Sequence, residues 1–316
     1  MKDKFSYSIL LFISKAFSLL PFGALYLISN IFSFFLYYIV RYRRGVVRKN
    51  LKISFPKKEL FEIIRIEKEF YKYFCDYFFE TLTLVYIKPS ILQKKIKFTN
   101  PEVLDKYFER KQSIILVAAH YGNWEMTALM PHFIKHKGLA VYKPQSNKGF
   151  DKFFIRLRQR FGLEAVPMAE IGKKLFKYSK QGIPTITYLL SDQRPDRLNV
   201  RYWTMFLNQE TPMILGPEKL SVKMDFPVFF LENKRISRGY YEATFKLIEE
   251  SPKLTQEFEI TEKLSVHLNN IINNDPIPWF WIHRRWKHRR FRDFLEMTHR
   301  TIDHPAVAYN KDLIKP

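Results

Sequence analysis

An unbroken apolar run, residues 113–119, passes directly into the polar cluster that extends from His120 to Glu125. The run reads Ser-Ile-Ile-Leu-Val-Ala-Ala, and a short apolar run of this kind is typical of a buried strand. In α/β folds the carboxyl ends of such strands carry reacting groups, because the strand holds the backbone rigid while the following turn exposes side chains. We therefore expect His120 and Glu125 at the end of a buried strand.

The chain after Pro89 alternates strand patterns with helix patterns. Further strands are predicted at 139–142, 185–190, 228–231 and 241–248, and helices at 124–133, 152–161, 172–180 and 255–272. This alternation predicts the α/β class, with a mostly parallel or mixed central sheet flanked by helices. A polar turn containing Asp192 and Gln193 leaves the strand at 185–190, so a second carboxylate is expected at a strand's carboxyl end.

The N-terminal segment is strongly apolar, with Lys15 as the only charged residue between Phe5 and Val40. The nineteen residues of 22–40 carry no charge, and as a helix they would extend about 28 Å, close to the thickness of the bilayer hydrocarbon. They predict a transmembrane or deeply inserted helix, preceded by an amphipathic stretch. A cleaved signal peptide fits less well, because the run is too long and no small-x-small cleavage site follows it.

These patterns divide the chain into an N-terminal membrane anchor at 1–41, one catalytic domain at 42–303 and a loose tail at 304–316. The basic stretch 41–49 follows the anchor directly, and an excess of Lys and Arg beside a membrane segment marks its cytoplasmic side. The catalytic domain is therefore expected on the cytoplasmic face of the membrane.

The charge balance predicts an anionic partner, because 53 Lys and Arg against 31 Asp and Glu give a net charge of +22. Anionic lipid and nucleic acid both fit this charge, but 30 Phe and 18 Tyr are more than a soluble nucleic-acid binder needs. The basic run 282–290, which follows Trp279 and Trp281 and contains Trp286, is accordingly interpreted as an interfacial patch for a lipid headgroup or an acidic protein. No nucleic-acid partner is expected.

His120 and Glu125 together suit general-base catalysis. A neutral imidazole can take a proton from a substrate hydroxyl while a carboxylate sets its tautomer and stabilises the imidazolium. The spacing alone also fits a helix-capping Glu beside a core His. His132 and His136 are four residues apart, but they lack an evident third ligand, so no metal site is predicted.

The block 118–125, Ala-Ala-His-Tyr-Gly-Asn-Trp-Glu, resembles the H-x4-D/E motif of the lysophospholipid acyltransferase superfamily. More closely, the chain resembles the late, or secondary, lipid A biosynthesis acyltransferases. The blocks that carry this resemblance, in family order, are Tyr42 to Leu51, Phe55-Pro56, 118–125, Val141 to Pro144 with the Arg-rich helix after it, Ser191 to Gln193, and Pro276 to Lys287.

The resemblance implies transfer of an acyl chain, usually from acyl carrier protein, to a hydroxyl of a lipid A precursor at the inner membrane. His120 would be the base and Glu125 its partner. The substrate-binding residues that it implies are Arg158, Arg160, Asp192 and Gln193. The acyl thioester would be a co-substrate, with no further cofactor, and the acceptor an anionic glycolipid.

Two departures from the family pattern concern the acceptor. Lys143 stands where the family commonly has Arg, and the stretch 203–208 lacks the usual Phe-Gly ending. An aminolipid, a glycerolipid or another glycolipid is therefore an alternative acceptor. A basic membrane-surface protein without catalytic activity is a further alternative.

Overall fold

The computed structural model describes residues 2–288. Its central sheet has seven strands in the order β1-β9-β8-β2-β5-β3-β4. The strands are β1 (Ile96–Phe98), β2 (Ile114–Ala118), β3 (Lys137–Tyr142), β4 (Glu164–Pro167), β5 (Thr185–Leu190), β8 (Val228–Ser237) and β9 (Tyr240–Glu249). Neighbouring strands are parallel except for the antiparallel hairpin β8–β9. The predicted mixed α/β sheet is confirmed.

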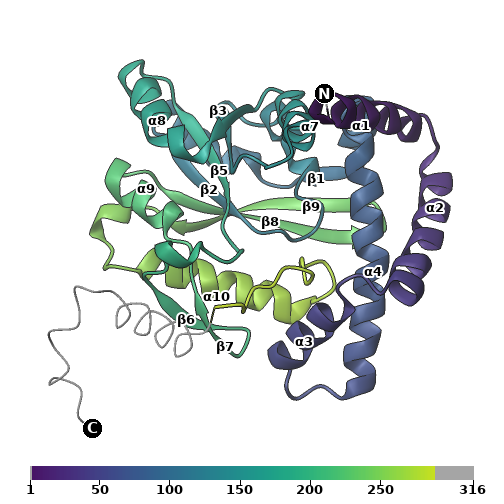
Figure 1. The fold of residues 1–316 in the computed structure, drawn as a ribbon. Helices are drawn as coiled ribbons and strands as arrows, with labels where there is room; N and C mark the ends of the chain where they lie inside the picture. Colours follow the sequence, from purple (N-terminus) through teal and green to yellow (C-terminus); the bar gives the residue numbers. More distant parts are fainter. Residues whose placement is uncertain (1, 289–316) are drawn as a thin grey trace, which may run out of the picture.

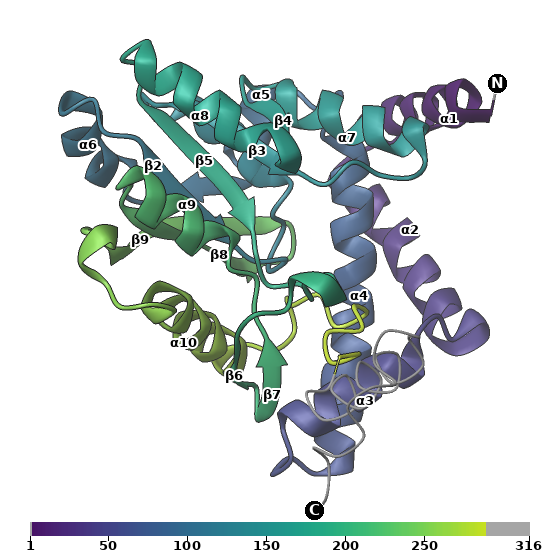
Figure 2. The same cartoon turned by 60° about the vertical axis from the view of Figure 1, so that its left-hand side comes forward.

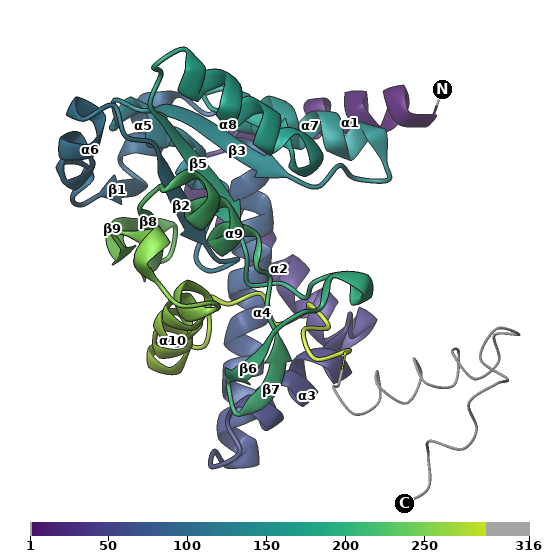
Figure 3. The same cartoon turned by 90° about the vertical axis from the view of Figure 1, so that its left-hand side faces the viewer.

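Helices cover both faces of this sheet. They are α1 (Lys2–Ser18), α2 (Phe22–Phe34), α3 (Arg44–Ser54), α4 (Leu60–Thr83), α5 (Pro89–Gln93), α6 (Asp105–Glu109), α7 (Lys148–Gln159), α8 (Ile171–Lys180), α9 (Gly216–Met224) and α10 (Glu259–Asn274). A two-stranded unit, β6 (Trp203–Phe206) and β7 (Gln209–Pro212), lies outside the main sheet beside α10. Figures 2 and 3 show α8 and α10 apart from each other, with β2 and β5 between them.

Strand β2 separates two apolar cores because its side chains alternate between the faces of the sheet. Ile115 and Val117 belong to the core that includes residues of α3, α4 and α10. Ile114 and Leu116 belong to the core that includes residues of α6 and α7. All four side chains are fully buried, so β2 is the centre of the molecule and its carboxyl end is held from both sides.

Helices α1, α2 and α4 form one flank of the molecule (Figure 1). Helix α2 runs beside α4 and continues as a short π-helix, η1 (Phe35–Val40). Phe22–Val40 is the one stretch within residues 2–288 that is long and apolar enough to cross a bilayer. Apolar side chains on this stretch face outward, while Leu25, Ser29 and Ser33 are buried against the protein.

Some elements differ from their predicted bounds. The helix expected at 124–133 is a 3-10 helix, η3 (Met126–His132), which contains Pro131. The strand expected at 228–231 extends to Ser237, because β9 pairs with it along a long hairpin. The predicted tail at 304–316 and the end of the predicted catalytic domain, 289–303, lie outside the described residues.

Candidate active site

The register of two parallel strands brings His120 and Asp192 together. Ala118 at the end of β2 pairs with Leu190 at the end of β5, and His120 and Asp192 each lie two residues further along. The Nδ1 atom of His120 is 2.7 Å from Oδ1 of Asp192. The polar groups that were expected at the ends of these two strands are therefore in direct contact.

Asp192 is buried and accepts hydrogen bonds on both of its oxygens. Trp279 Nε1 donates to Oδ2 over 2.9 Å, and the His120 ring occupies Oδ1. Burial raises the pKa of Asp192, but the attraction of His120 and the N–H donors outweigh burial and hold this pKa below its usual value. The carboxylate is therefore ionised and can only accept, so Nδ1 carries the ring proton and Nε2 has a free lone pair.

The amide of Gln193 lies at that lone pair. Its Nε2 atom is 3.2 Å from Nε2 of His120, and with Nδ1 protonated the amide must be the donor. The side chain of His120 is 17% exposed, whereas that of Asp192 is 2% exposed. A hydroxyl that reaches the imidazole would replace the Gln193 amide at Nε2.

Aromatic rings enclose the imidazole. Trp124 meets the His120 ring edge to face with centroids 4.9 Å apart, and Phe280 lies 5.8 Å away. Trp124 is itself stacked on Tyr77 of α4 at 4.1 Å. These rings restrict the orientation of His120 and lower the polarity around it.

Gly122 allows the sharp turn after His120. Its φ is +60°, and a Cβ there would lie 2.3 Å from the backbone oxygen of Asn233, so both the conformation and the close approach require glycine. The Gly122 N–H donates to the carbonyl of Pro278, and its carbonyl accepts from the Tyr73 hydroxyl at 2.6 Å. The backbone of the loop is thus held from two sides.

Glu125 does not hold His120, which differs from the expected contact. Its carboxylate accepts from Arg158 of α7 through Nη2 at 2.8 Å and Nε at 3.3 Å. The turn at Gly122 and the 3-10 geometry that begins at Met126 direct Glu125 toward α7 instead of toward the imidazole. Burial lowers the pKa of Arg158, but the Glu125 carboxylate more than compensates and raises it, so the guanidinium is charged.

Arg160 lies away from this pair. Its guanidinium donates to the carbonyls of Leu84 and Ile87, which follow the end of α4. Burial lowers its pKa, and Arg156 adds to this effect. Arg160 differs from Arg158 in its partners because residues two apart on a helix point to different faces. Its role in substrate binding stays a prediction.

The block near residue 280 lies against the site instead of forming a wholly exposed basic patch. Arg285 is 1% exposed, and burial lowers its pKa to about 10. His283 accepts the backbone N–H of Arg194 at 3.2 Å, and burial lowers its pKa to about 4. Asn50 of α3 donates to the carbonyls of Trp281 and His283, each over 2.9 Å. The charges of this run predicted a place on the surface, whereas Arg285 contacts the carbonyl of Pro212 and the sulfur of Met213 in the interior.

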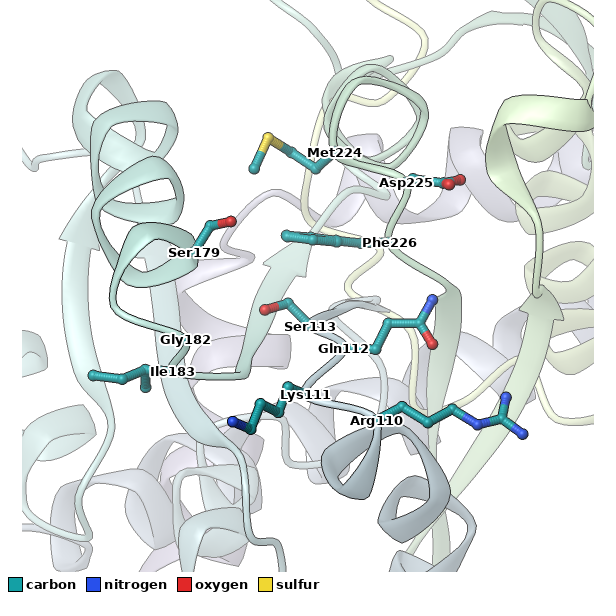
Figure 4. Close-up of a pocket in the computed structure, with 10 residues that line it drawn as sticks. All are labelled: Arg110, Lys111, Gln112, Ser113, Ser179, Gly182, Ile183, Met224, Asp225 and Phe226. Carbon is teal, nitrogen blue, oxygen red and sulfur yellow. The ribbon is translucent and has the colours of Figure 1, made fainter.

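A cavity of about 330 Å³ lies at the other end of the sheet (Figure 4). Gln112 and Ser113 line it just before β2, and Ile183 lies just before β5. This cavity is therefore separated from His120 by the length of β2. No group of three His, Cys, Asp or Glu side chains that could hold a metal ion occurs within 2–288, and Nε2 of His136 contacts the carbonyl oxygen of Gln112.

The arrangement at the sheet edge is that of a general base. A buried, ionised carboxylate orients an imidazole whose other nitrogen is free to accept a proton from a hydroxyl. The α/β sheet and this strand-end pair together define the class as an α/β enzyme site built for proton abstraction.

Comparison with known proteins identifies the family. The family model described as bacterial lipid A biosynthesis acyltransferase matches residues 2–288, and the chain belongs to this family. The protein is thus an acyltransferase that acts on membrane lipid. One matching solved structure is the 1-acyl-sn-glycerophosphate (LPA) acyltransferase PlsC from Thermotoga maritima, with 14% identity and a TM-score of 0.33; the match covers 78% of this chain and 95% of that one. A search of curated proteins found no match.

Proposed function

We propose that this protein transfers a fatty acyl chain from an acyl thioester to a hydroxyl of a lipid A precursor, with His120 as the general base. The observation that carries the mechanism is the 2.7 Å contact of His120 Nδ1 with the buried Asp192, which leaves Nε2 to accept a proton. Family membership supports the substrate class. The acyl thioester is the only co-substrate, and no cofactor or metal takes part.

The reaction proceeds by direct transfer. The acceptor hydroxyl displaces Gln193, gives its proton to His120 Nε2 and attacks the thioester carbonyl, forming the C–O bond. The tetrahedral intermediate then collapses, the C–S bond breaks, and the leaving thiolate takes the proton back from the imidazolium. Asp192 stabilises the imidazolium between these two transfers. The released Gln193 amide is placed to hydrogen-bond the hydroxyl or the developing oxyanion.

Arg158 binds an anionic group of the substrate, and Glu125 positions it. The Arg158 side chain is 21% exposed, whereas that of Glu125 is 5% exposed, so part of the arginine reaches solvent while two hydrogen bonds to Glu125 hold the guanidinium plane. Guanidinium groups suit phosphates because of their planar fork. Both a phosphorylated glycolipid and a phosphopantetheine thioester would offer such a phosphate.

Helices α1 and α2 attach the protein to the cytoplasmic face of the inner membrane. Asn30 lies in the middle of the apolar stretch 22–40 and accepts a hydrogen bond from Arg238 over 2.8 Å. The Arg238 side chain is 36% exposed. A membrane-crossing α2 would carry this partly exposed guanidinium near the bilayer centre, which is costly. We therefore infer that α2 lies in one leaflet, with Leu27 and Ile31 in the lipid, and does not cross the bilayer.

The donor is acyl carrier protein. The net charge of +22 favours an acidic partner over a neutral one. Exposed cations near the site edge, including Lys143, Arg284 and Lys287, provide a surface for it.

Mass spectrometry of lipid A and phospholipids tests the function in cells with the gene intact, deleted, or carrying His120→Ala. The expected result is loss of one lipid A acyl chain in both altered strains. His132→Ala is the matched control, because His132 is exposed and lies on η3, so its lipid A should be unchanged. Unchanged lipid A with a change in another lipid class would contradict the proposed acceptor, and no change in any lipid would contradict a catalytic role.

A further inference from the structure

A fully buried carboxylate, Glu80 of α4, joins three separate parts of the protein. Its exposure is 0%, and it has no part in the mechanism described above. Oε1 accepts from the Tyr26 hydroxyl of α2 over 2.9 Å. Oε2 accepts from Asn123 Nδ2 and from the Tyr241 hydroxyl, each over 2.8 Å. One carboxylate thus contacts the membrane-facing helix, the loop after His120 and strand β9.

Asn123 transmits this contact to the catalytic loop. Its Nδ2 donates to Glu80 while its Oδ1 accepts the backbone N–H of Met126 at 3.3 Å. Its side chain is 0% exposed. Glu80 therefore sets the orientation of the Asn123 amide, which closes the turn between His120 and Glu125. The conformation of this turn decides where the His120 and Glu125 side chains point.

Helix α2 packs on α4 through both side-chain hydrogen bonds and apolar contacts. Its buried residues are Leu25, Ser29 and Ser33, and Phe32 meets Phe79 of α4 with ring centroids 5.6 Å apart. Ser29 donates to Asp76 of α4 at 2.7 Å. The outer face exposes Leu27 and Ile31 at 61% and 64%. Hydrogen bonds depend more steeply on geometry than apolar contacts do. A shift of α2 at the lipid surface would therefore weaken the hydrogen bond from Tyr26 to Glu80.

The balance of charge at Glu80 makes it sensitive to such a shift. Burial raises the pKa of Glu80, and the donors Asn123, Tyr241 and Tyr26 oppose part of that rise. Loss of a donor therefore favours the neutral carboxyl. A neutral carboxyl carries its own proton and offers fewer acceptor positions to Asn123.

We propose that Glu80 is a positioning residue that couples the seating of α2 on the membrane to the geometry of the catalytic loop. Tyr26, Glu80 and Asn123 form the connection, so lipid contact that seats α2 orders the loop that carries His120. The protein is accordingly more active per bound molecule on a membrane than in a dispersed state. The measurement of kcat that tests this inference rests on the proposed function, whereas the hydrogen-exchange measurement does not.

The test compares Tyr26→Phe with Ser29→Ala. Each variant removes one hydroxyl that α2 donates to an α4 carboxylate. Asp76, the Ser29 partner, makes no hydrogen bond to residues 120–126 within the described chain. On vesicles that contain anionic lipid and acceptor, Tyr26→Phe should lower kcat by about three- to thirty-fold with KM for the acceptor nearly unchanged. Ser29→Ala should keep kcat within about two-fold. Equal losses in the two variants, or none in Tyr26→Phe, would overturn the proposal.

Hydrogen exchange of the peptide covering 120–126 supplies a readout without substrate. Adding anionic vesicles should slow exchange of this peptide in the native protein and in Ser29→Ala, but not in Tyr26→Phe, while all three proteins bind the vesicles equally in flotation. An identical response in Tyr26→Phe and the native protein overturns the coupling. If the native protein lacks acyl transfer yet shows the exchange pattern, the proposed function fails while the coupling stands.

Discussion

Buried carboxylates organise both the sheet edge at His120 and the flank between α2 and α4, but on different scales. At the edge, Asp192 holds a single imidazole from a strand whose register is set over five paired residues. At the flank, Asp76 and Glu80 bind Ser29 and Tyr26 of α2 through side-chain hydrogen bonds, beside apolar contacts such as that of Phe32 with Phe79. The backbone pairing of the sheet holds the catalytic pair rigid, whereas α2 meets α4 through side chains and is more adjustable.

The largest expected effect is at the pair formed by His120 and Asp192. Asp192→Asn removes the charge that sets the His120 tautomer and stabilises the imidazolium. We expect kcat to fall by about 10²–10⁴, measured as initial rates of acyl transfer on vesicles, with an unchanged melting temperature as the check on folding. A loss smaller than tenfold would mean that Asp192 does not orient the base.

The next effect concerns the flank. Arg238→Ala removes two hydrogen bonds to Asp76, of 2.7 and 2.9 Å, and the contacts to α2. We expect the free energy of unfolding to fall by about 2 kcal/mol, since hydrogen bonds to a charged group are lost. Arg235→Ala is the matched control, because Arg235 makes one longer bond to Asp76, at 3.2 Å. Chemical denaturation in detergent measures both. We expect the smaller loss in Arg235→Ala, and an unchanged free energy of unfolding in Arg238→Ala would show that the flank does not depend on Arg238.

A smaller effect is expected at Arg158. Arg158→Lys keeps the charge but loses the planar fork that Glu125 holds, so KM for the phosphorylated substrate should rise about tenfold with little change in kcat. Arg156→Lys, on the exposed face of α7, should leave KM unchanged. A fall in kcat at constant KM would place Arg158 in the chemical step instead of in binding.

The last prediction is a pH dependence of stability at His283. In the folded protein its pKa is lowered to about 4, from 6.5. Between these values the unfolded chain binds a proton that the folded protein excludes, so His283 lowers stability as pH falls from about 6.5 to about 4. His283→Gln should flatten this part of the profile of melting temperature against pH. An unchanged slope would show that His283 titrates normally in the folded protein.

The sequence predicted the strand ends but not all of the contacts made there. The apolar runs placed His120, Asp192 and Gln193 at strand ends. That β2 and β5 are neighbours, and that Asp192 instead of Glu125 contacts His120, depends on the strand order of the sheet, which periodicity does not give. The contact of Glu125 with Arg158 was not predictable, because it depends on a 3-10 turn and on the side of α7 that faces the sheet. The burial of Arg285 was missed for a similar reason, since composition alone places a basic run on the surface.

For the flank formed by α2 and α4, the sequence predicted the apolar outer surface of α2 but not its contacts with α4. The apolar run 22–40 predicted a membrane-inserted helix, and the structure exposes Leu27 and Ile31 on it, but its polar residues Tyr26 and Ser29 gave no signal of their contacts with α4. Their partners lie on α4, about fifty residues away along the chain. Contacts between helix faces depend on tertiary packing, which local patterns do not encode.

The most direct test of the central claim is the tautomer of His120, measured by ¹⁵N NMR on histidine-labelled protein at alkaline pH, where imidazole is neutral. The His120 signals are assigned by their absence in His120→Gln. With Asp192 as the partner, Nδ1 should be protonated and Nε2 unprotonated, Asp192→Asn should mix the tautomers, and Glu125→Gln should leave them unchanged. A proton on Nε2 in the native protein, or a mixture of tautomers caused by Glu125→Gln alone, would contradict the role of Asp192 as the group that orients His120.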